Sequence, residues 1–159
     1  MSPAQQTSKK ERVLEQLRAN MGAIAQPERF FTVIKATIME GAQLINGEDL
    51  PKIAILETED TFLRALSCGS DEHRLNVAII GALRRPSGSE EWKSKAFQFE
   101  ADILQALNDD RQLSGQALYS EKVNSTIADS DTQGNTTLVF VEVQAQIVYR
   151  TVASDVTSD

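Results

Sequence analysis

Residues that commonly carry catalytic or metal chemistry are scarce in this sequence. Its 159 residues include one cysteine, Cys68, and one histidine, His73. A single cysteine excludes an internal disulfide and is typical of proteins from a reducing cytoplasm. The sequence also contains no GxGxxG motif and no Walker loop, the common glycine-rich phosphate-binding motifs. The composition therefore favours a protein that is not an enzyme, and we expect no cofactor and no metal.

Clustered positive charge and long apolar runs are also missing. The formal net charge is −7, and the basic residues form only short pairs such as Lys9-Lys10 and Arg84-Arg85. This balance argues against a basic groove for nucleic acid. No apolar run reaches the length of about 18 residues that a membrane span needs, and residues 1–7 lack the apolar region of a signal peptide. We expect no membrane span and a location in the cytoplasm.

The neighbourhood of the cysteine offers one candidate for nucleophilic chemistry. Cys68 would be the nucleophile, His73 the base and Asp71 the acid that orients it. No nucleophile elbow or oxyanion motif surrounds Cys68, however. A cysteine in a loop and a histidine at the edge of a strand is the simpler interpretation.

Residues 129–134, Asp-Ser-Asp-Thr-Gln-Gly, resemble the first half of a calcium-binding loop. Asp129, Asp131 and Gln133 would supply oxygen ligands, and Gly134 would make the sharp turn. The position at which a bidentate glutamate belongs is occupied by Phe140, and a strand follows where a helix is required. A connecting loop between strands is therefore favoured, and a small calcium-binding or regulatory module is the alternative.

Periodicity and capping signals predict two main helices and five strands. The helices are expected at 8–24 and 89–108, because Ser8 with Glu11 and Ser87 with Glu90 form capping boxes before apolar residues at helical spacing. The strands are expected at 30–39, 52–58, 73–83, 115–127 and 137–151, with loops at 41–49 and 129–135 and a short helical turn at 61–66.

This order, α-β-β-β-α-β-β, predicts an α+β fold in which two helices pack on one side of a mostly antiparallel sheet. Residues 1–151 are expected to form one domain that ends in a long β-hairpin. Residues 152–159 are expected to form a flexible polar tail.

The last strand has the clearest pattern in the chain. One of its faces is apolar, whereas the other is mixed and carries Phe140, Glu142, Gln144, Gln146, Val148 and Arg150. From Leu138 to Arg150 the strand would span roughly 43 Å, which is about the diameter of a compact domain of this size. A strand of this length predicts contacts with a neighbouring subunit.

The sequence resembles the tail terminator proteins of tailed bacteriophages, also called tail completion or minor tail proteins. The resemblance covers residues 10–151 and consists of five segments in order. They are the helix around Val13-Leu14-Glu15-Gln16-Leu17, the aromatic segment Arg29-Phe30-Phe31-Thr32-Val33, Leu50-Pro51-Lys52-Ile53-Ala54-Ile55 with its acidic continuation, Leu75-Asn76-Val77-Ala78-Ile79-Ile80-Gly81, and the helix of residues 100–107 that precedes the long strand ending Ile147-Val148-Tyr149-Arg150.

The resemblance implies a structural protein that forms a hexameric ring on the head-proximal end of a tail tube. Such a ring stops polymerisation of the tube protein and offers a docking surface to the head connector and neck proteins. DNA passes through it without specific binding. The protein would assemble in the host cytoplasm and end in the virion, at the junction of tail and head. The alternative within the same particle is a head–tail joining (neck) protein.

Two groups of residues are candidates for these contacts. The predicted subunit contacts are Trp92, Phe140, Gln144, Gln146 and Val148, and the predicted acidic residues of the channel are Glu57, Glu59 and Asp60. A competing interpretation is that Phe140 and Val148 pack beneath the N-terminal helix. An acidic channel would repel the phosphate backbone of the passing DNA.

Overall fold

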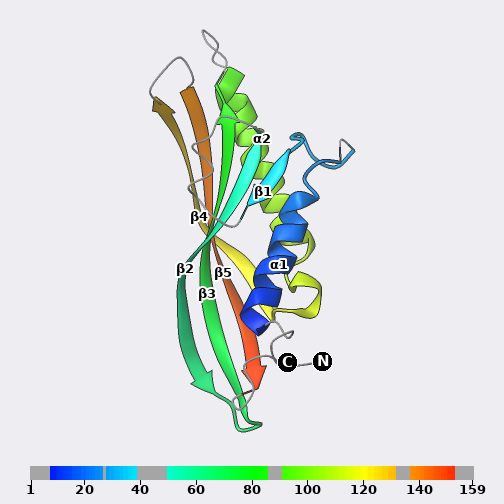
Figure 1. The fold of residues 1–159 in the computed structure, drawn as a ribbon, viewed down its shortest axis with the longest axis vertical. Coiled ribbons are helices and arrows are strands. Elements are labelled where there is room, and N and C mark those ends of the chain that lie inside the picture. Colours follow the sequence, from blue (N-terminus) through cyan, green and yellow to red (C-terminus); the bar gives the residue numbers. More distant parts are fainter. Residues whose placement is uncertain (1–7, 27, 39–49, 86–90, 132–136, 153–159) are drawn as a thin grey trace.

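The protein has an α+β fold in which two helices cover one face of a twisted sheet (Figure 1). The computed structural model describes residues 8–26, 28–38, 50–85, 91–131 and 137–152. Within these ranges the order of helices and strands is α1-β1-β2-β3-α2-β4-β5, with a 3-10 turn before β4. The predicted fold class and the predicted order of elements are confirmed.

The sheet has the strand order β1-β2-β3-β5-β4, and in the described part of the chain only the short pair β1 and β2 is parallel. The strands are β1 Ala36–Ile38, β2 Lys52–Ala65, β3 Ser70–Arg84, β4 Tyr119–Asp131 and β5 Thr137–Val152. In the centre, β3 and β5 pair without a register shift from Ser70↔Val152 to Arg84↔Leu138. The C-terminal hairpin, β4 and β5, is confirmed.

The helices are α1, Lys9–Gly22, and α2, Glu91–Asp109, followed by the 3-10 turn η3, Leu113–Gly115. The predicted capping box of α1 is present, because the Ser8 side chain accepts from the Glu11 backbone N–H and the Glu11 side chain accepts in return. The second predicted box, Ser87 with Glu90, lies outside the described residues, as do the loop at 41–49 and residues 153–159 of the predicted tail.

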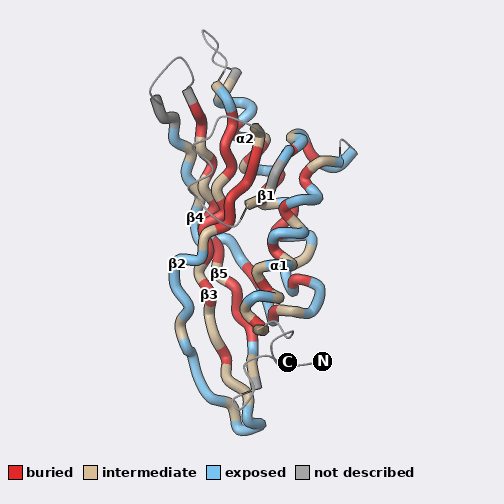
Figure 2. The backbone as a smooth tube through the Cα atoms, in the orientation of Figure 1, coloured by how far each residue is buried: buried red, intermediate tan, exposed pale blue. Residues whose placement is uncertain are grey.

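The core lies between the helices and the sheet. The apolar face of β5 is buried as predicted, from Val139 to Tyr149 at every second residue. Against it pack Val13, Leu17 and Met21 of α1 and Ala96, Phe99, Ile103 and Leu107 of α2. Figure 2 shows this buried layer along the strands beside the helices, while much of β2 is exposed.

The predicted strand at 30–39 is wrong over residues 30–35; Ala36–Ile38 form β1, and residue 39 lies outside the described residues. Backbone groups before Ala36 find partners outside a ladder. The carboxylate of Asp102, which is 1% exposed, accepts from the N–H of Phe31 at 3.0 Å and of Thr32 at 2.7 Å. This segment is therefore held by a buried carboxylate of α2, although its β-branched and aromatic residues favour a strand.

The second predicted strand is longer than expected. β2 continues from the predicted end at Thr58 to Ala65, so the expected helical turn at 61–66 is wrong. Register shifts occur between Glu57 and Glu59 and between Phe62 and Arg64. Each extra residue shifts the alternation of faces, so this strand has no period-two pattern in the sequence.

The fourth strand begins and ends later than predicted. Gly115 lies in η3 rather than in a strand, and β4 starts at Tyr119. At the other end, the backbone of Asp129 to Asp131 pairs with Val139 to Thr137. The first three positions of the suspected calcium loop are therefore strand, and its remaining positions lie outside the described residues.

The contact between α2 and β3 leaves no room for a side chain at Gly81. A Cβ on Gly81 would lie 2.7 Å from Cε2 and 2.8 Å from Cζ of the buried Phe99 ring. We expect Gly81→Ala to lower the free energy of unfolding by about 1–3 kcal/mol, because a well-packed core has to shift. Urea denaturation followed by circular dichroism measures this change.

Gly22 provides the matched control at the end of α1. A Cβ there would meet only Thr37 Oγ1 at an ordinary 3.6 Å. Gly22→Ala should be neutral or stabilising by up to about 1 kcal/mol, because alanine favours a helix. Equal stability of Gly81→Ala and the wild type would contradict the tight contact of α2 with β3.

Candidate functional site

The face of the sheet opposite the helices carries the predicted contact residues of β5. Phe140, Gln144, Gln146 and Val148 alternate with the buried residues that face α1 and α2. In the part of the chain that the structure describes, no helix lies on this side of the sheet (Figure 1). We call it the open face.

Two β-bulges lie at the same level of the sheet, on opposite sides of the central pair. In β2 the extra residue is Thr58, between Glu57, which pairs with Val77, and Glu59, which pairs with Asn76. In β4 the extra residue is Val123, which lies between the residue that pairs with Ala145 of β5 and the residue that pairs with Gln144 of β5. Because Val77 pairs with Ala145, the two bulges fall on one row across four strands. Bulges increase local twist, and Figure 1 shows the strands crossing closely at mid-height.

A hollow of about 390 Å³ opens on this row. The bulged residues Thr58 and Val123 line it from the two outer strands, and Gln144 and Gln146 line it from β5. The remaining lining residues are Arg74, Asn76, Val77 and Ala145. Two of the five predicted subunit contacts therefore lie in one depression of the open face.

Most polar groups around the hollow have partners within the chain. Thr58 Oγ1 donates to the carbonyl of Asn76 at 3.0 Å, and Gln146 Nε2 donates to Glu121 Oε1 at 2.8 Å. Asn76 Nδ2 lies 3.5 Å from Glu59 Oε2. The carboxylates of Glu59 and Glu121, which lie beside the hollow, thus each have a side-chain amide as hydrogen-bond partner.

Arg74 is the exception among these groups. Its Nε is shielded from solvent and has no acceptor among the described residues. A shielded donor without a partner costs about 1–3 kcal/mol. The other two arginines of this region do have a carboxylate, because Glu72 Oε2 lies 3.5 Å from Arg64 Nη2 and 3.4 Å from Arg150 Nε.

From the level of the hollow downward, residues 59–76 of β2 and β3 form a hairpin, which we call the arm, and its tip extends past the helices (Figures 1 and 2). The β2 strand of the arm is mostly exposed. Its apolar residues Phe62 and Leu63 are 56% and 37% exposed to solvent. Sequence patterning does not predict the arm, because the predicted strand ends at Thr58 whereas β2 continues to Ala65.

A polar and aromatic cluster joins the arm to α1 and β5. Tyr149 Oη donates to Asp60 Oδ2 at 2.8 Å, and the rings of His73 and Tyr149 stack with centroids 5.3 Å apart. Lys10 of α1 forms ion pairs with Glu57 and with Asp60, the latter at 3.4 Å. Burial lowers the pKa of Lys10, but the hydrogen bonds and charges of the two carboxylates outweigh burial and raise it.

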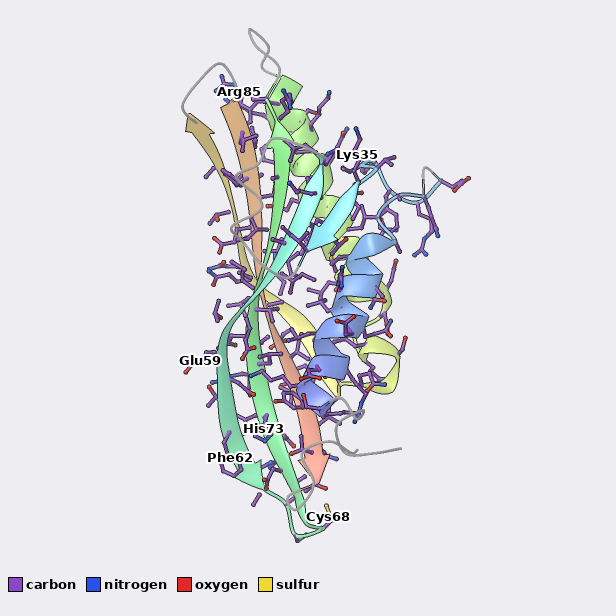
Figure 3. The ribbon with its side chains drawn as sticks, in the orientation of Figure 1. Lys35, Glu59, Phe62, Cys68, His73 and Arg85 are labelled. Carbon is purple, nitrogen blue, oxygen red and sulfur yellow. The ribbon has the colours of Figure 1, made fainter. Side chains whose placement is uncertain are left out.

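The bulge at Thr58 decides where the predicted channel acids lie. It places Glu57 and Asp60 on the same side of β2, where both reach Lys10. Glu59 lies on the open face beside Asn76, on the side away from the helices in Figure 3. The three carboxylates are therefore divided between two faces and do not form one patch within a single chain.

The other predicted contact residues pack against apolar neighbours or are buried. Phe140 packs on the open face with a small cluster around Ala54 and Ala82, rather than beneath α1. Val148 is 2% exposed. Trp92 packs against the core, with the Arg85 guanidinium 5.0 Å from its ring centroid.

The suspected catalytic residues are not brought together. Cys68 is exposed at the tip of the arm with Sγ 3.4 Å from Ser70 Oγ, whereas His73 lies further up against Phe62 and Tyr149 (Figure 3). The described residues contain no group of three side chains suited to a metal. No described helix is both long and apolar enough to span a membrane.

Comparison with models of known protein families gives no match, and the search of curated proteins gives none either. The open face and the arm are therefore the features of the molecule from which a function can be inferred.

The burial of Tyr149 in this cluster can be tested through its pKa. Burial raises the pKa of Tyr149, and the hydrogen bond to Asp60 and the charges of Asp60 and Glu57 raise it further. A pKa above the unfolded value of about 10 contributes stability that is present below pH 10 and is lost as the pH rises above it. We expect the free energy of unfolding to fall more steeply above about pH 10 in the wild type than in Tyr149→Phe.

Absorbance of tyrosinate gives an independent measurement on the same protein. The chain has two tyrosines, Tyr119 and Tyr149, and Tyr119 is 46% exposed. Because its pKa is raised, Tyr149 should contribute tyrosinate absorbance only as the chain unfolds at alkaline pH, and the difference between the titrations of the wild type and Tyr149→Phe isolates its signal. Ionisation of Tyr149 in the folded state near pH 10 would contradict its burial.

Proposed function

We propose that this chain is a structural assembly protein that forms a ring on the head-proximal end of a phage tail tube. The ring stops addition of tube subunits and offers its outer surface to head-docking proteins. The α+β fold with a long C-terminal hairpin agrees with what the resemblance implies.

The observation that carries the proposal is the mismatch between the sheet and the helices that cover it. β2 to β5 contain 13 to 16 residues each, yet the helices cover one face only, and the arm continues past them (Figure 1). Phe62 and Leu63 are left in water on the arm. An isolated chain gains nothing from this exposure, whereas a ring can bury the arm against a neighbouring copy.

The open face supplies a second surface for the same assembly. Its lower half is polar, with Gln144 exposed and Gln146 partly exposed beside the hollow. Partly polar surfaces are typical of interfaces between subunits that also exist apart. Cyclic symmetry repeats each modest contact around the ring, so the assembly does not need a strong individual contact.

The absolute mass of the purified protein tests the ring. Six copies of the 17.5 kDa chain give roughly 105 kDa by light scattering, and negative-stain images should show rings. Addition of the protein to the polymerising tube protein of the same phage should shorten the tubes. A protein that stays monomeric both alone and with tubes would overturn the proposal, and binding to the connector without an effect on tubes would favour the neck protein.

A substitution on the open face tests which surface is used. Gln146→Arg adds bulk and charge beside the hollow, and Glu121 remains as a local partner. We expect the monomer to keep its melting temperature while the dissociation constant of the oligomer rises at least tenfold, which corresponds to about 1.4 kcal/mol.

Gln105→Arg on the exposed side of α2 is the matched control for the same change. It should leave both the melting temperature and the mass unchanged. Oligomers of Gln146→Arg that are as stable as those of the control would remove the lower open face from the interface.

A further inference from the structure

The outer strand of the arm has much less support than the start of the same strand. Residues 52–55 of β2 are all buried, whereas every residue from Glu57 to Ala65 is intermediate or exposed. No described strand pairs with the outer edge of residues 59–65, because β1 pairs only with Lys52 to Ala54 (Figure 1). Few buried contacts and solvent-exposed backbone hydrogen bonds are typical of segments that open locally. We call residues 59–65 the strap.

The ladder that holds the strap is short and irregular. Its register with β3 shifts between Glu57 and Glu59, and again between Phe62 and Arg64. Each bulge leaves a residue unpaired and disrupts the ladder locally. On its other side β3 pairs with β5 without a shift over its whole length, so it keeps this partner when the strap leaves. Opening of the strap therefore breaks one interrupted ladder and leaves the central pair of strands intact.

The side chain of Asp60 connects the strap to two elements beyond its own ladder. Asp60 Oδ2 accepts a hydrogen bond from Tyr149 Oη of β5 at 2.8 Å and lies 3.4 Å from Lys10 Nζ of α1. Lys10 also forms an ion pair with Glu57, so one ammonium group contacts a carboxylate on each side of the bulge at Thr58. Although the strap is exposed, the Asp60 side chain itself is 21% exposed.

The other described contacts of the strap attach it only to β3. Glu59 Oε2 lies 3.5 Å from Asn76 Nδ2, and Arg64 Nη2 lies 3.5 Å from Glu72 Oε2. Phe62 meets a ring of β3 edge-on and still leaves about half of its surface in water. Contacts to one neighbouring strand add little to the ladder itself, whereas Asp60 joins the strap to the helix layer and to the far side of β3.

We propose that the strap opens independently of the rest of the sheet, and that Asp60 forms with Lys10 and Tyr149 a clasp that keeps it closed. Hydrogen bonds to an ionised carboxylate are roughly twice as strong as neutral ones. The three residues come from β2, α1 and β5, so the clasp fixes the strap to both layers of the fold. This device belongs to a single chain and does not require the ring.

The clasp determines which edge the arm presents. When the strap is closed, the edge is β2 with its two bulges. When the strap is open, the edge is residues 70–76 of β3, which have no bulge in their ladder with β5. A regular edge is a better template for a further strand than a bulged one. The strap therefore switches the arm between a protected edge and an edge that can pair.

Hydrogen exchange followed by mass spectrometry measures this opening segment by segment. In the wild type, the amides of the strap should exchange roughly tenfold faster than those of residues 143–149 of β5, after correction for intrinsic rates. Asp60→Asn removes the charge with little change of shape and should accelerate exchange of the strap roughly threefold, with no change in β5. Glu59→Gln is the matched control, because this neighbouring acid lies on the open face outside the clasp.

Lys10 provides a test from the opposite side of the clasp. Lys10→Gln removes a cation from the first turn of α1, where a positive charge is unfavourable, so it should loosen the strap without weakening the helix. Combined with Asp60→Asn it should add little, because both substitutions remove the same ion pair. Arg18→Gln, on the exposed side of α1, is the control for the lost charge. Raising sodium chloride from about 0.05 M to about 1 M should accelerate exchange of the strap more in the wild type than in the double variant.

The outcomes separate the strap from the clasp. Equal exchange of the strap and β5 in the wild type would overturn the independent opening. A strap that opens on its own but responds to Asp60→Asn and Lys10→Gln no more than to Glu59→Gln and Arg18→Gln would overturn the clasp. If Asp60→Asn also accelerates exchange in β5, Lys10→Gln decides the result. Failure of either part leaves the proposed ring untouched, and a chain that forms no ring still tests both.

Discussion

The uninterrupted ladder between β3 and β5 is the constraint on which the rest of this structure depends. Fifteen consecutive residues of β3 pair with β5, from Ser70 to Arg84. Both register-shifted strands, β2 and β4, are neighbours of this pair and not part of it. The regular centre fixes which residues face the helices, so the outer strands can bulge without disturbing the core. The positions of the arm, the hollow and the core are therefore all set by the pairing of β3 with β5.

The residues of β5 show how much of this arrangement the sequence contains. Strict alternation predicts both its buried face and the placement of Gln144 and Gln146 on the opposite face, because the strand pairs without interruption. The same reasoning fails in β2, where Thr58 and Leu63 are extra residues and acidic side chains have low strand propensity. It also fails at 30–35, where Asp102, distant in the sequence, accepts the backbone N–H groups.

The candidate site is only half predictable for the same physical reason. The two glutamines follow from a local pattern, whereas Arg74 matters because of an acceptor that is missing, and no local pattern reports this. The division of Glu57, Glu59 and Asp60 between two faces depends on the single extra residue Thr58. The only sequence feature that bears on this division is the lack of alternation after Leu56. It does not distinguish an irregular strand from a loop, because both lack a period-two pattern.

The bulges in the outer strands also determine how this sheet behaves toward other sheets. A regular, unpaired edge is a template for a further strand, and copies joined at such edges extend without limit. Here β2 is bulged at Thr58 and Leu63, and β4 at Val123. Each bulge turns the edge out of line and removes a consecutive run of free donors and acceptors. Bulged edges are therefore poorer templates for a further strand than regular ones, which disfavours open-ended association of copies through the sheet.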